Sequence, residues 1–265
     1  MMIFPEFNPI AVQLGPVAVH WYGLAYVAAL LGGLALAKAL AARRGVAGIT
    51  PHTVDDFFIW MVAGVIAGGR LGYVLFYNPG HYMANPAEIL QVWHGGMSFH
   101  GGVAGVAVAM AMFAWKRGLN VLALADTIAP VVPLGCFLGR IANFINGELV
   151  GRAASPNLPW AMVFPHIDGL PRHPSQLYQA GLEGLVLGAL MAVAVARGPH
   201  KRGALAGLFL VGYALARLVG EQFRTPEITY LGGFFTQGML LSVPMALGGL
   251  WLLMRRTSSP QTQTK

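Results

Sequence analysis

Three long stretches of the chain contain no Asp, Glu, Lys or Arg, and this feature restricts its fold more than any other. They cover residues 7–37, 89–115 and 228–254. A helix needs about 20 mainly apolar residues to cross the hydrocarbon core of a bilayer. Charged residues make up only 10% of the 265-residue chain, against about a quarter in ordinary soluble domains. We therefore expect a membrane protein rather than a soluble one.

Four further apolar stretches qualify as spans with one or two charges inside or beside them. The sequence thus predicts an all-α polytopic membrane protein with seven transmembrane helices, near residues 19–38, 57–77, 97–115, 119–139, 176–196, 204–223 and 237–254. No internal repeat divides the chain. We expect residues 1–256 to form a single transmembrane domain and residues 257–265 to be a polar, disordered tail.

The basic residues predict how these helices are oriented. Eleven of the 17 Lys and Arg residues lie beside one set of helix ends: Lys38, Arg43, Arg44, Lys116, Arg117, Arg197, Lys201, Arg202, Arg255, Arg256 and Lys265. Such ends are usually cytoplasmic. The N-terminus should then face outward and the C-terminus the cytoplasm. The net charge of +7 is explained by topology and gives no reason to expect a nucleic-acid partner.

Asp126 and Glu183 lie inside two of the expected spans, 119–139 and 176–196. Several other charged residues in or beside the spans fall in the outer halves on this topology. These residues are Arg70, Arg140, Arg217 and Glu221, with Arg224 just beyond. Charges inside a bilayer are costly and usually mark a site or a water-filled cavity. Arg217, Glu221 and Arg224 share one helical face by their spacing, so they could simply neutralise one another. The excess of arginine nevertheless favours an anion, and phosphate fits the bidentate guanidinium fork.

Three polar segments accompany these charges. Residues 93–105 read WHGGMSFHGGVAG and place His100 among glycines, either as a proton acceptor or as an interfacial residue. Residues 139–152 read GRIANFINGELVGR, where Asn146-Gly147 predicts a turn and Glu148 a loop position, free to pair with Arg140 or Arg152. In residues 171–178, PRHPSQLY, we expect Ser175 to cap a helix and His173 to face a ligand or the interface.

Six blocks together resemble a known family. They are HWYGL at 20–24, GGRLGYVLFYN at 68–78, WHGGMSFHGG at 93–102, GRIANFINGELVGR at 139–152, RHPSQLY at 172–178 and ARLVGEQFR at 216–224. In their order and spacing they closely resemble the prolipoprotein diacylglyceryl transferase family. The resemblance implies a bacterial plasma-membrane enzyme with its active site on the periplasmic side. Such an enzyme transfers the diacylglyceryl group of phosphatidylglycerol to the lipobox cysteine of a prolipoprotein signal peptide and releases glycerol 1-phosphate.

The resemblance also implies which residues act. Those that match the family's functional positions are His100, Arg140 and Arg217 as catalytic residues, and Tyr22, Asn143, Glu148, Gly151 and Glu221 as substrate-binding residues. From their placement we add Arg70, His173 and Arg224 to the substrate-binding set. The scheme needs no cofactor, and no set of ligand-spaced His, Cys or carboxylate residues predicts a metal.

The implied chemistry assigns roles to these residues as a hypothesis. Sulfur attacks the glyceryl carbon, and a thiol of pKa about 8.5 is mostly protonated at neutral pH. His100, or a water that it polarises, would take the thiol proton, although a field of arginines alone could also ionise it. Arg140 and Arg217 would hold the phosphate. Glu148 and Glu221 would orient the arginines, and Asn143 would bond the head group.

Two other classes of protein fit part of the pattern. An anion transporter or channel would also place arginines in a membrane cavity, but it predicts polar positions in both halves of the spans. An intramembrane serine protease could use Ser98 with His100, but two residues separated by one position point to different sides of a helix. The chain also has no G-x-S-x-G sequence.

Overall fold

The computed structural model describes residues 2–198, 200–226, 229–230 and 235–255, apart from the side chains of His94, Phe99 and His100. The expected tail, residues 257–265, lies outside this description. The chain forms two compact units, one from residues 1–36 with 128–265 and one from residues 37–127.

Most of the described chain is helical. Within it, six helical segments are long and apolar enough to cross a membrane: α1 (Trp21–Arg44), α2 (Pro51–Phe76), Val121–Ile145, Ser175–Ala196, α9 (Ala204–Glu221) and α10 (Gln237–Met254). A shorter apolar helix covers Gly101–Lys116, the greater part of α4 (Phe99–Lys116). The expectation of an all-α polytopic membrane protein is confirmed, while the seventh span stays a prediction.

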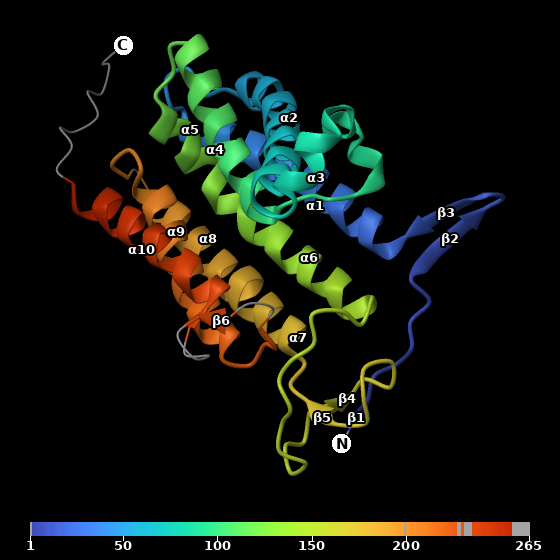
Figure 1. Ribbon diagram of the computed structural model, residues 1–265. Helices are drawn as coiled ribbons and strands as arrows, with labels where there is room; N and C mark the ends of the chain where they lie inside the picture. Colours follow the sequence, from blue (N-terminus) through green and yellow to red (C-terminus); the bar gives the residue numbers. More distant parts are fainter. Residues whose placement is uncertain (1, 199, 227–228, 231–234, 256–265) are drawn as a thin grey trace. The chain divides into compact units, whose positions relative to one another are not determined.

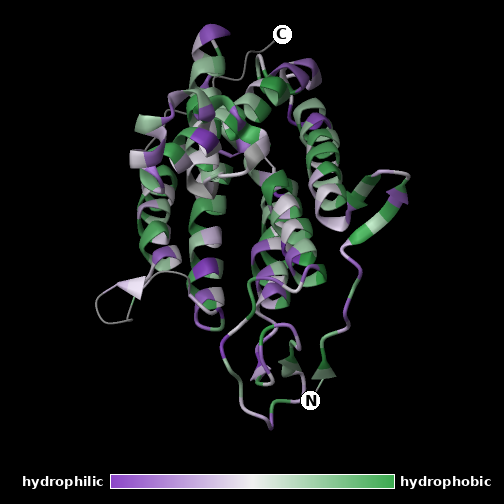
Figure 2. Ribbon diagram, turned by 45° about the vertical axis from the view of Figure 1, so that its right-hand side comes forward, coloured by the Kyte–Doolittle hydropathy of each residue, from purple (hydrophilic) through white to green (hydrophobic). Residues whose placement is uncertain are grey.

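Two of the six segments change their helical form part-way. Val121–Ile145 consists of α5 (Val121–Ile128), the short helix η3 (Ala129–Val131) and α6 (Val132–Ile145). Ser175–Ala196 consists of α7 (Ser175–Gln179), the π-helical segment η4 (Ala180–Val186) and α8 (Leu187–Ala196). Figure 2 shows these helices mainly green and white, with purple gathered at helix ends and in the connecting segments.

The unit of residues 37–127 is built on α2 and α4, which lie against each other through glycines. A Cβ placed on Gly68 would lie 2.3 Å from the carbonyl oxygen of Gly101, and one on Gly105 would lie 2.1 Å from that of Gly64. Only glycine permits this approach, as is common between membrane helices. The link from α2 to α4 contains α3 (Pro79–Ala84), η1 (Pro86–Leu90) and η2 (Val92–His94).

In the other unit, α9 lies beside α10 and also packs against α8, and α6 packs against η4 (Figure 1). Leu187, Met191 and Leu205 form a buried apolar cluster between α8 and α9. Gly207 and Gly249 allow α9 and α10 to meet, since a Cβ on either would lie less than 3 Å from the other's carbonyl oxygen. This bundle positions the polar residues described below.

Short strands, which the sequence analysis did not predict, join the same unit. β1 (Met2–Ile3) pairs in parallel with β4 (Met162–Val163), which pairs antiparallel with β5 (Pro171–Arg172). β2 (Ile10–Leu14) and β3 (Val17–His20) form a hairpin that leads into α1. β6 (Thr229–Tyr230) pairs with β7 (Phe235–Thr236) before α10.

Two local predictions are corrected. The fourth expected span was placed at residues 119–139, closed by Arg140, but α6 continues to Ile145 and Arg140 lies more than a turn inside it. Ser175 is not the helix cap, because α7 already begins at this residue and Pro174 takes the cap position. The Ser175 hydroxyl instead donates to the carbonyl oxygen of Leu149. The turn expected at Asn146-Gly147 is confirmed, since Gly147 has a positive φ of 66°.

Candidate active site

A buried carboxylate joins two arginines from different helices. Glu183 on η4 has a side chain only 1% exposed. Its Oε2 accepts a hydrogen bond from Arg140 Nε on α6 at 3.2 Å, and its Oε1 lies 3.5 Å from Arg217 Nη1 on α9. A carboxylate buried this deeply needs cationic partners. Three neighbouring elements are therefore tied together by charge.

A second glutamate extends this arrangement along α9. Glu221 Oε1 lies 2.6 Å from Arg217 Nη2 and 3.9 Å from Arg224 Nη1. The hydroxyl of Thr236, at the start of α10, donates to Glu221 Oε2 at 2.7 Å. Gly238 packs directly against the Glu221 carboxylate, because a Cβ there would lie 2.7 Å from Glu221 Oε1. The predicted role of Glu221 in orienting an arginine agrees with this geometry.

We call these five residues, Arg140, Glu183, Arg217, Glu221 and Arg224, the arginine cluster. Among these five residues, the three cations exceed the two carboxylates by one charge. Among the described residues, Arg140 hydrogen-bonds Glu183 through Nε, and its two terminal nitrogens have no protein acceptor. Its side chain is 16% exposed. An arginine that binds a carboxylate through Nε keeps both terminal nitrogens available and is therefore suited to bind a phosphate.

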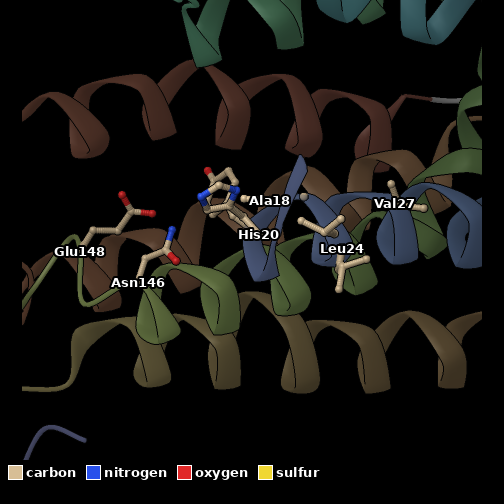
Figure 3. Close-up of a pocket in the computed structure, with 9 residues that line it drawn as sticks. Ala18, His20, Leu24, Val27, Asn146 and Glu148 are labelled. Atoms are coloured by element: carbon tan, nitrogen blue, oxygen red, sulfur yellow. The ribbon is translucent and has the colours of Figure 1, made fainter. Parts of the chain in front are cut away.

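An open pocket of about 820 Å³ lies in the same unit, between β3, the first turns of α1 and the end of α6. Figure 3 shows Leu24 and Val27 on α1 at one end of the pocket, the side chains of Asn146 and Glu148 at the other, and His20 between them. Tyr22 also lines this pocket. Its lining is therefore mainly apolar with a polar end, which suits a molecule with an acyl chain and a head group.

Asn143 and Glu148 meet beside this pocket. Asn143 is buried on α6, one turn beyond Arg140, and its side-chain amide donates to Glu148 Oε1 at 2.9 Å. Glu148 thus contacts Asn143 rather than Arg140 or Arg152, which were the partners considered from sequence. Tyr22 lies 3.2 Å, oxygen to oxygen, from the hydroxyl of Tyr26.

Gly151 lies where three chain segments cross. A Cβ on this residue would lie 2.1 Å from the carbonyl oxygen of His173 and 2.8 Å from that of Phe223. Its own carbonyl accepts a hydrogen bond from Arg172 Nη1. Nδ1 of His173 lies 3.2 Å from the Tyr178 hydroxyl, and its ring packs on Phe223. Both residues therefore have packing roles, and their binding of substrate stays a prediction.

Next to this crossing, Arg172 forms an ion pair on the surface. Its Nη2 lies 2.5 Å from Asp168 Oδ2, and Nε also donates to Asp168 Oδ1. The hydrogen bond from Arg172 holds the pKa of Asp168 below its usual value, and the bond from the Leu170 amide acts in the same direction. The pair fixes the strand β5 just before His173.

Arg70 belongs to the unit of residues 37–127 and has partners of another kind. It is 4% exposed, and its guanidinium donates to the backbone carbonyls of Glu88, Ile89, Gly95 and Gly96. The predicted catalytic residue His100 stands in the first turn of α4, after the N-cap Ser98. Its side chain lies outside the described residues.

The structure thus brings together Arg140, Arg217, Glu221 and Arg224, four of the residues predicted from sequence. Sequence reasoning missed Glu183, which was noted only as a charge inside a span. A signal was present, because a glutamate within an apolar helix needs a cation. No group of three or more His, Cys, Asp or Glu residues that could hold a metal occurs among the residues searched, which are those the structure describes.

Comparison with known proteins identifies the family to which this chain belongs. The model of the family described as prolipoprotein diacylglyceryl transferase matches residues 9–255. The chain belongs to this family. Among similar proteins, one from Gluconacetobacter diazotrophicus is 52% identical over 98% of this chain and 94% of its own length. One from Paramagnetospirillum magneticum is 53% identical over 95% of this chain and 94% of its own length.

A third member of the family, from Rhodospirillum rubrum, is 51% identical over 93% of this chain and 91% of its own length. All three carry the name phosphatidylglycerol--prolipoprotein diacylglyceryl transferase. Their names describe transferases that act on phosphatidylglycerol and prolipoprotein. The transporter alternative has no support in these comparisons.

Proposed function

We propose that this protein transfers the diacylglyceryl group from phosphatidylglycerol to a prolipoprotein. The family match covers nearly the whole chain, and the relatives that carry this name are about half identical to it. The arginine cluster is the structural observation that supports the proposal best. Its excess positive charge sits on helices apolar enough to cross a membrane, where a phospholipid phosphate would be accessible.

The acceptor in this proposal is the lipobox cysteine thiol of the signal peptide. Its sulfur forms a bond to the glyceryl carbon while the bond from that carbon to the phosphate oxygen breaks. The electron pair leaves with the phosphate, which departs as glycerol 1-phosphate, and the thiol proton passes to a base. Arg140 and Arg217 bind the phosphate and stabilise the charge that grows on the leaving oxygen.

The base in this proposal is His100, and the assignment rests on the sequence resemblance alone. Histidine is the side chain best suited to accept a proton near neutral pH. Replacing His100 with Gln should lower the rate of thioether formation and remove its dependence on pH near neutrality. Full activity of His100→Gln with an unchanged pH profile would overturn the assignment and favour ionisation of the thiol by the arginines.

The remaining predicted residues complete the substrate site in this proposal. Asn143 hydrogen-bonds the head group, and Glu148 holds the Asn143 amide in place through the bond between them. Tyr22 lines the pocket in which the lipid lies. Arg224 adds charge to the cluster, while Gly151 and His173 support it from the crossing of three segments. Arg70 holds the loop before α4 within its own unit, and its binding of substrate stays a prediction from sequence.

We also propose a topology for the single transmembrane domain of residues 1–256. Besides the six long helices, α4 crosses the bilayer as the seventh span. The N-terminus is outside and the C-terminus cytoplasmic in a bacterial inner membrane, so that the arginine cluster faces the periplasmic side. Cysteine accessibility labelling at Gly15 and Gly198 in intact cells tests this topology, since only the first position should react with an impermeant reagent.

The direct test of function is a reconstituted reaction. Purified protein in detergent or proteoliposomes is incubated with phosphatidylglycerol and a lipobox peptide, and the peptide is analysed by mass spectrometry. A diacylglyceryl adduct on the peptide is expected, with glycerol 1-phosphate as the second product. A control peptide with Ser in place of Cys should remain unmodified. Absence of the adduct on the Cys peptide would overturn the proposed function.

A further inference from the structure

Glu183 is the most buried member of the arginine cluster and lies between two of its arginines. Its two carboxylate oxygens lie toward different arginines, at 3.2 Å from Arg140 and 3.5 Å from Arg217. The segment that carries it, η4, packs against both α6 and α9. The position of each arginine side chain is therefore set in part by the same carboxylate.

The backbone around Glu183 is shaped to bring it to Arg140. Residues Ala180–Val186 form a π-helical segment inside an otherwise α-helical span. Such wide turns are rare and frequently occur at functional sites. The next residue, Gly184, permits very close approach to α6, because a Cβ there would lie 2.6 Å from Phe137 Cβ and 2.8 Å from Phe137 Cα.

The charge of Glu183 limits the positive charge of the cluster. Three arginines and two glutamates give a net charge of +1, and removing the Glu183 charge would leave +2. A phosphodiester such as the lipid substrate carries one negative charge, whereas a phosphate monoester product carries up to two. Each extra positive charge in a poorly hydrated site strengthens binding of the more highly charged anion.

We propose that Glu183 is a positioning residue that holds Arg140 and Arg217 at the spacing needed for one phosphate and keeps the product from binding too tightly. It touches no substrate and acts through the two arginines. The proposal deepens the proposed function and rests on it. It predicts that a shorter side chain at position 183 lowers kcat alone, whereas loss of the charge lowers kcat and also strengthens product binding.

Two substitutions separate these effects. Glu183→Gln keeps the shape but removes the charge, so kcat should fall about 10- to 100-fold and glycerol 1-phosphate should inhibit at concentrations at least about threefold lower. Glu183→Asp keeps the charge but is one methylene shorter. For this variant we expect kcat to fall by about tenfold or more, with the inhibition constant of glycerol 1-phosphate within about twofold of the wild-type value.

A matched control is Glu88→Gln, since the Glu88 carboxylate also has a side-chain partner, with its Oε2 2.8 Å from His81 Nε2, but its side chain is 41% exposed and belongs to the other unit. Thermal unfolding in detergent verifies that each variant is folded. If Glu183→Gln does not fold, Glu183→Asp is compared with Gly184→Ala, which should push η4 away from Phe137 and lower kcat in the same way.

The proposal is overturned if kcat of folded Glu183→Gln stays within about twofold of wild type. It is also overturned if kcat falls without tighter product binding, because structural damage alone would do that. If only Glu183→Asp and Gly184→Ala can be compared, unchanged kcat in both variants overturns the proposal. These results are distinct from failure of the proposed function, in which wild-type protein itself would form no thioether.

Discussion

Arg70 and Arg140 are both largely buried arginines in apolar helices, yet their partners differ in kind. Arg70 donates to four backbone carbonyls of the segment before α4. Arg140 has a carboxylate behind it, and its terminal nitrogens have no acceptor in the described part of the chain. The guanidinium of Arg70 is thus occupied by the protein itself, whereas that of Arg140 retains the capacity to bind an anion.

An arginine inside a membrane helix is therefore not by itself a sign of substrate binding. A guanidinium has five N–H donors, and their acceptors decide its role. Carbonyl acceptors from one loop fix that loop in place. A single carboxylate neutralises the charge and leaves most donors available. Substitutions of the two arginines and of residues near them should therefore have distinct effects on activity and stability.

The strongest test is Arg140→Lys, which keeps the charge but loses the planar fork. If Arg140 binds the phosphate in the transition state, kcat/KM for thioether formation should fall about 100-fold or more. Reaction of a lipobox peptide with phosphatidylglycerol, followed by mass spectrometry, measures it. The conservative control is Arg43→Lys, at an exposed position near the end of α1. Near wild-type kcat/KM in Arg140→Lys would contradict the claim that Arg140, unlike Arg70, binds the phosphate.

Gly151→Ala tests the crossing of segments next to the cluster. The added methyl group would collide with the backbone oxygens of His173 and Phe223, which cannot move aside as a flexible side chain would. We expect a loss of stability of about 1–3 kcal/mol together with lower activity, measured by thermal unfolding and by the peptide assay. Gly169→Ala is the control, because a Cβ there meets nothing within 4 Å. Equal stability of the two variants would refute this account of Gly151.

Arg70→Lys tests whether Arg70 stabilises the fold through its backbone partners. A lysine cannot serve four carbonyls in the same directions, and each buried acceptor left without a donor costs about 1–3 kcal/mol. The melting temperature should fall, while the turnover of the folded fraction remains close to wild type. A large rise in KM for phosphatidylglycerol with unchanged stability would instead support the sequence-based prediction that Arg70 binds substrate.

The smallest effect concerns Asp168 and its surface pair with Arg172. The pKa of Asp168 is lowered by this partner, so the pair stabilises the fold above the usual carboxyl pKa of about 3.9. That contribution is lost as pH falls through the lower folded pKa. Asp168→Asn should therefore melt slightly below wild type at neutral pH, and the difference should vanish in acid. A difference independent of pH would contradict the pairing.

Much of the helical layout could be predicted from the sequence, because apolar length alone identifies a membrane span. The sequence also placed Arg217 and Glu221 correctly on one face of α9, since four residues along an α-helix return to nearly the same side. Arg224 lies beyond the end of α9, although its Nη1 is still 3.9 Å from Glu221 Oε1. Arg140 was placed at a helix end because apolar length does not show where a polar final turn stops, and α6 continues through Asn143 to Ile145.

The ion pair between Glu183 and Arg140 could not be predicted from helical spacing. Helical periodicity assumes about 3.6 residues per turn, but the π-helical segment around Glu183 turns more slowly and shifts the face on which it lies. The carbonyl partners of Arg70 were equally hidden, because backbone acceptors leave no mark in a sequence. Strands of two residues, such as β4 and β5, are too short to show an alternating pattern.

Equilibrium binding of glycerol 1-phosphate reports on the anion site without requiring catalysis, so it distinguishes the roles of Arg140 and Arg70. Calorimetric titration compares wild-type protein with Arg140→Lys and Arg70→Lys, each first shown to be folded. We predict that affinity falls at least about tenfold in Arg140→Lys and stays near wild type in Arg70→Lys. Unchanged affinity in Arg140→Lys, or a loss confined to Arg70→Lys, would contradict the assignment of the phosphate to the arginine cluster.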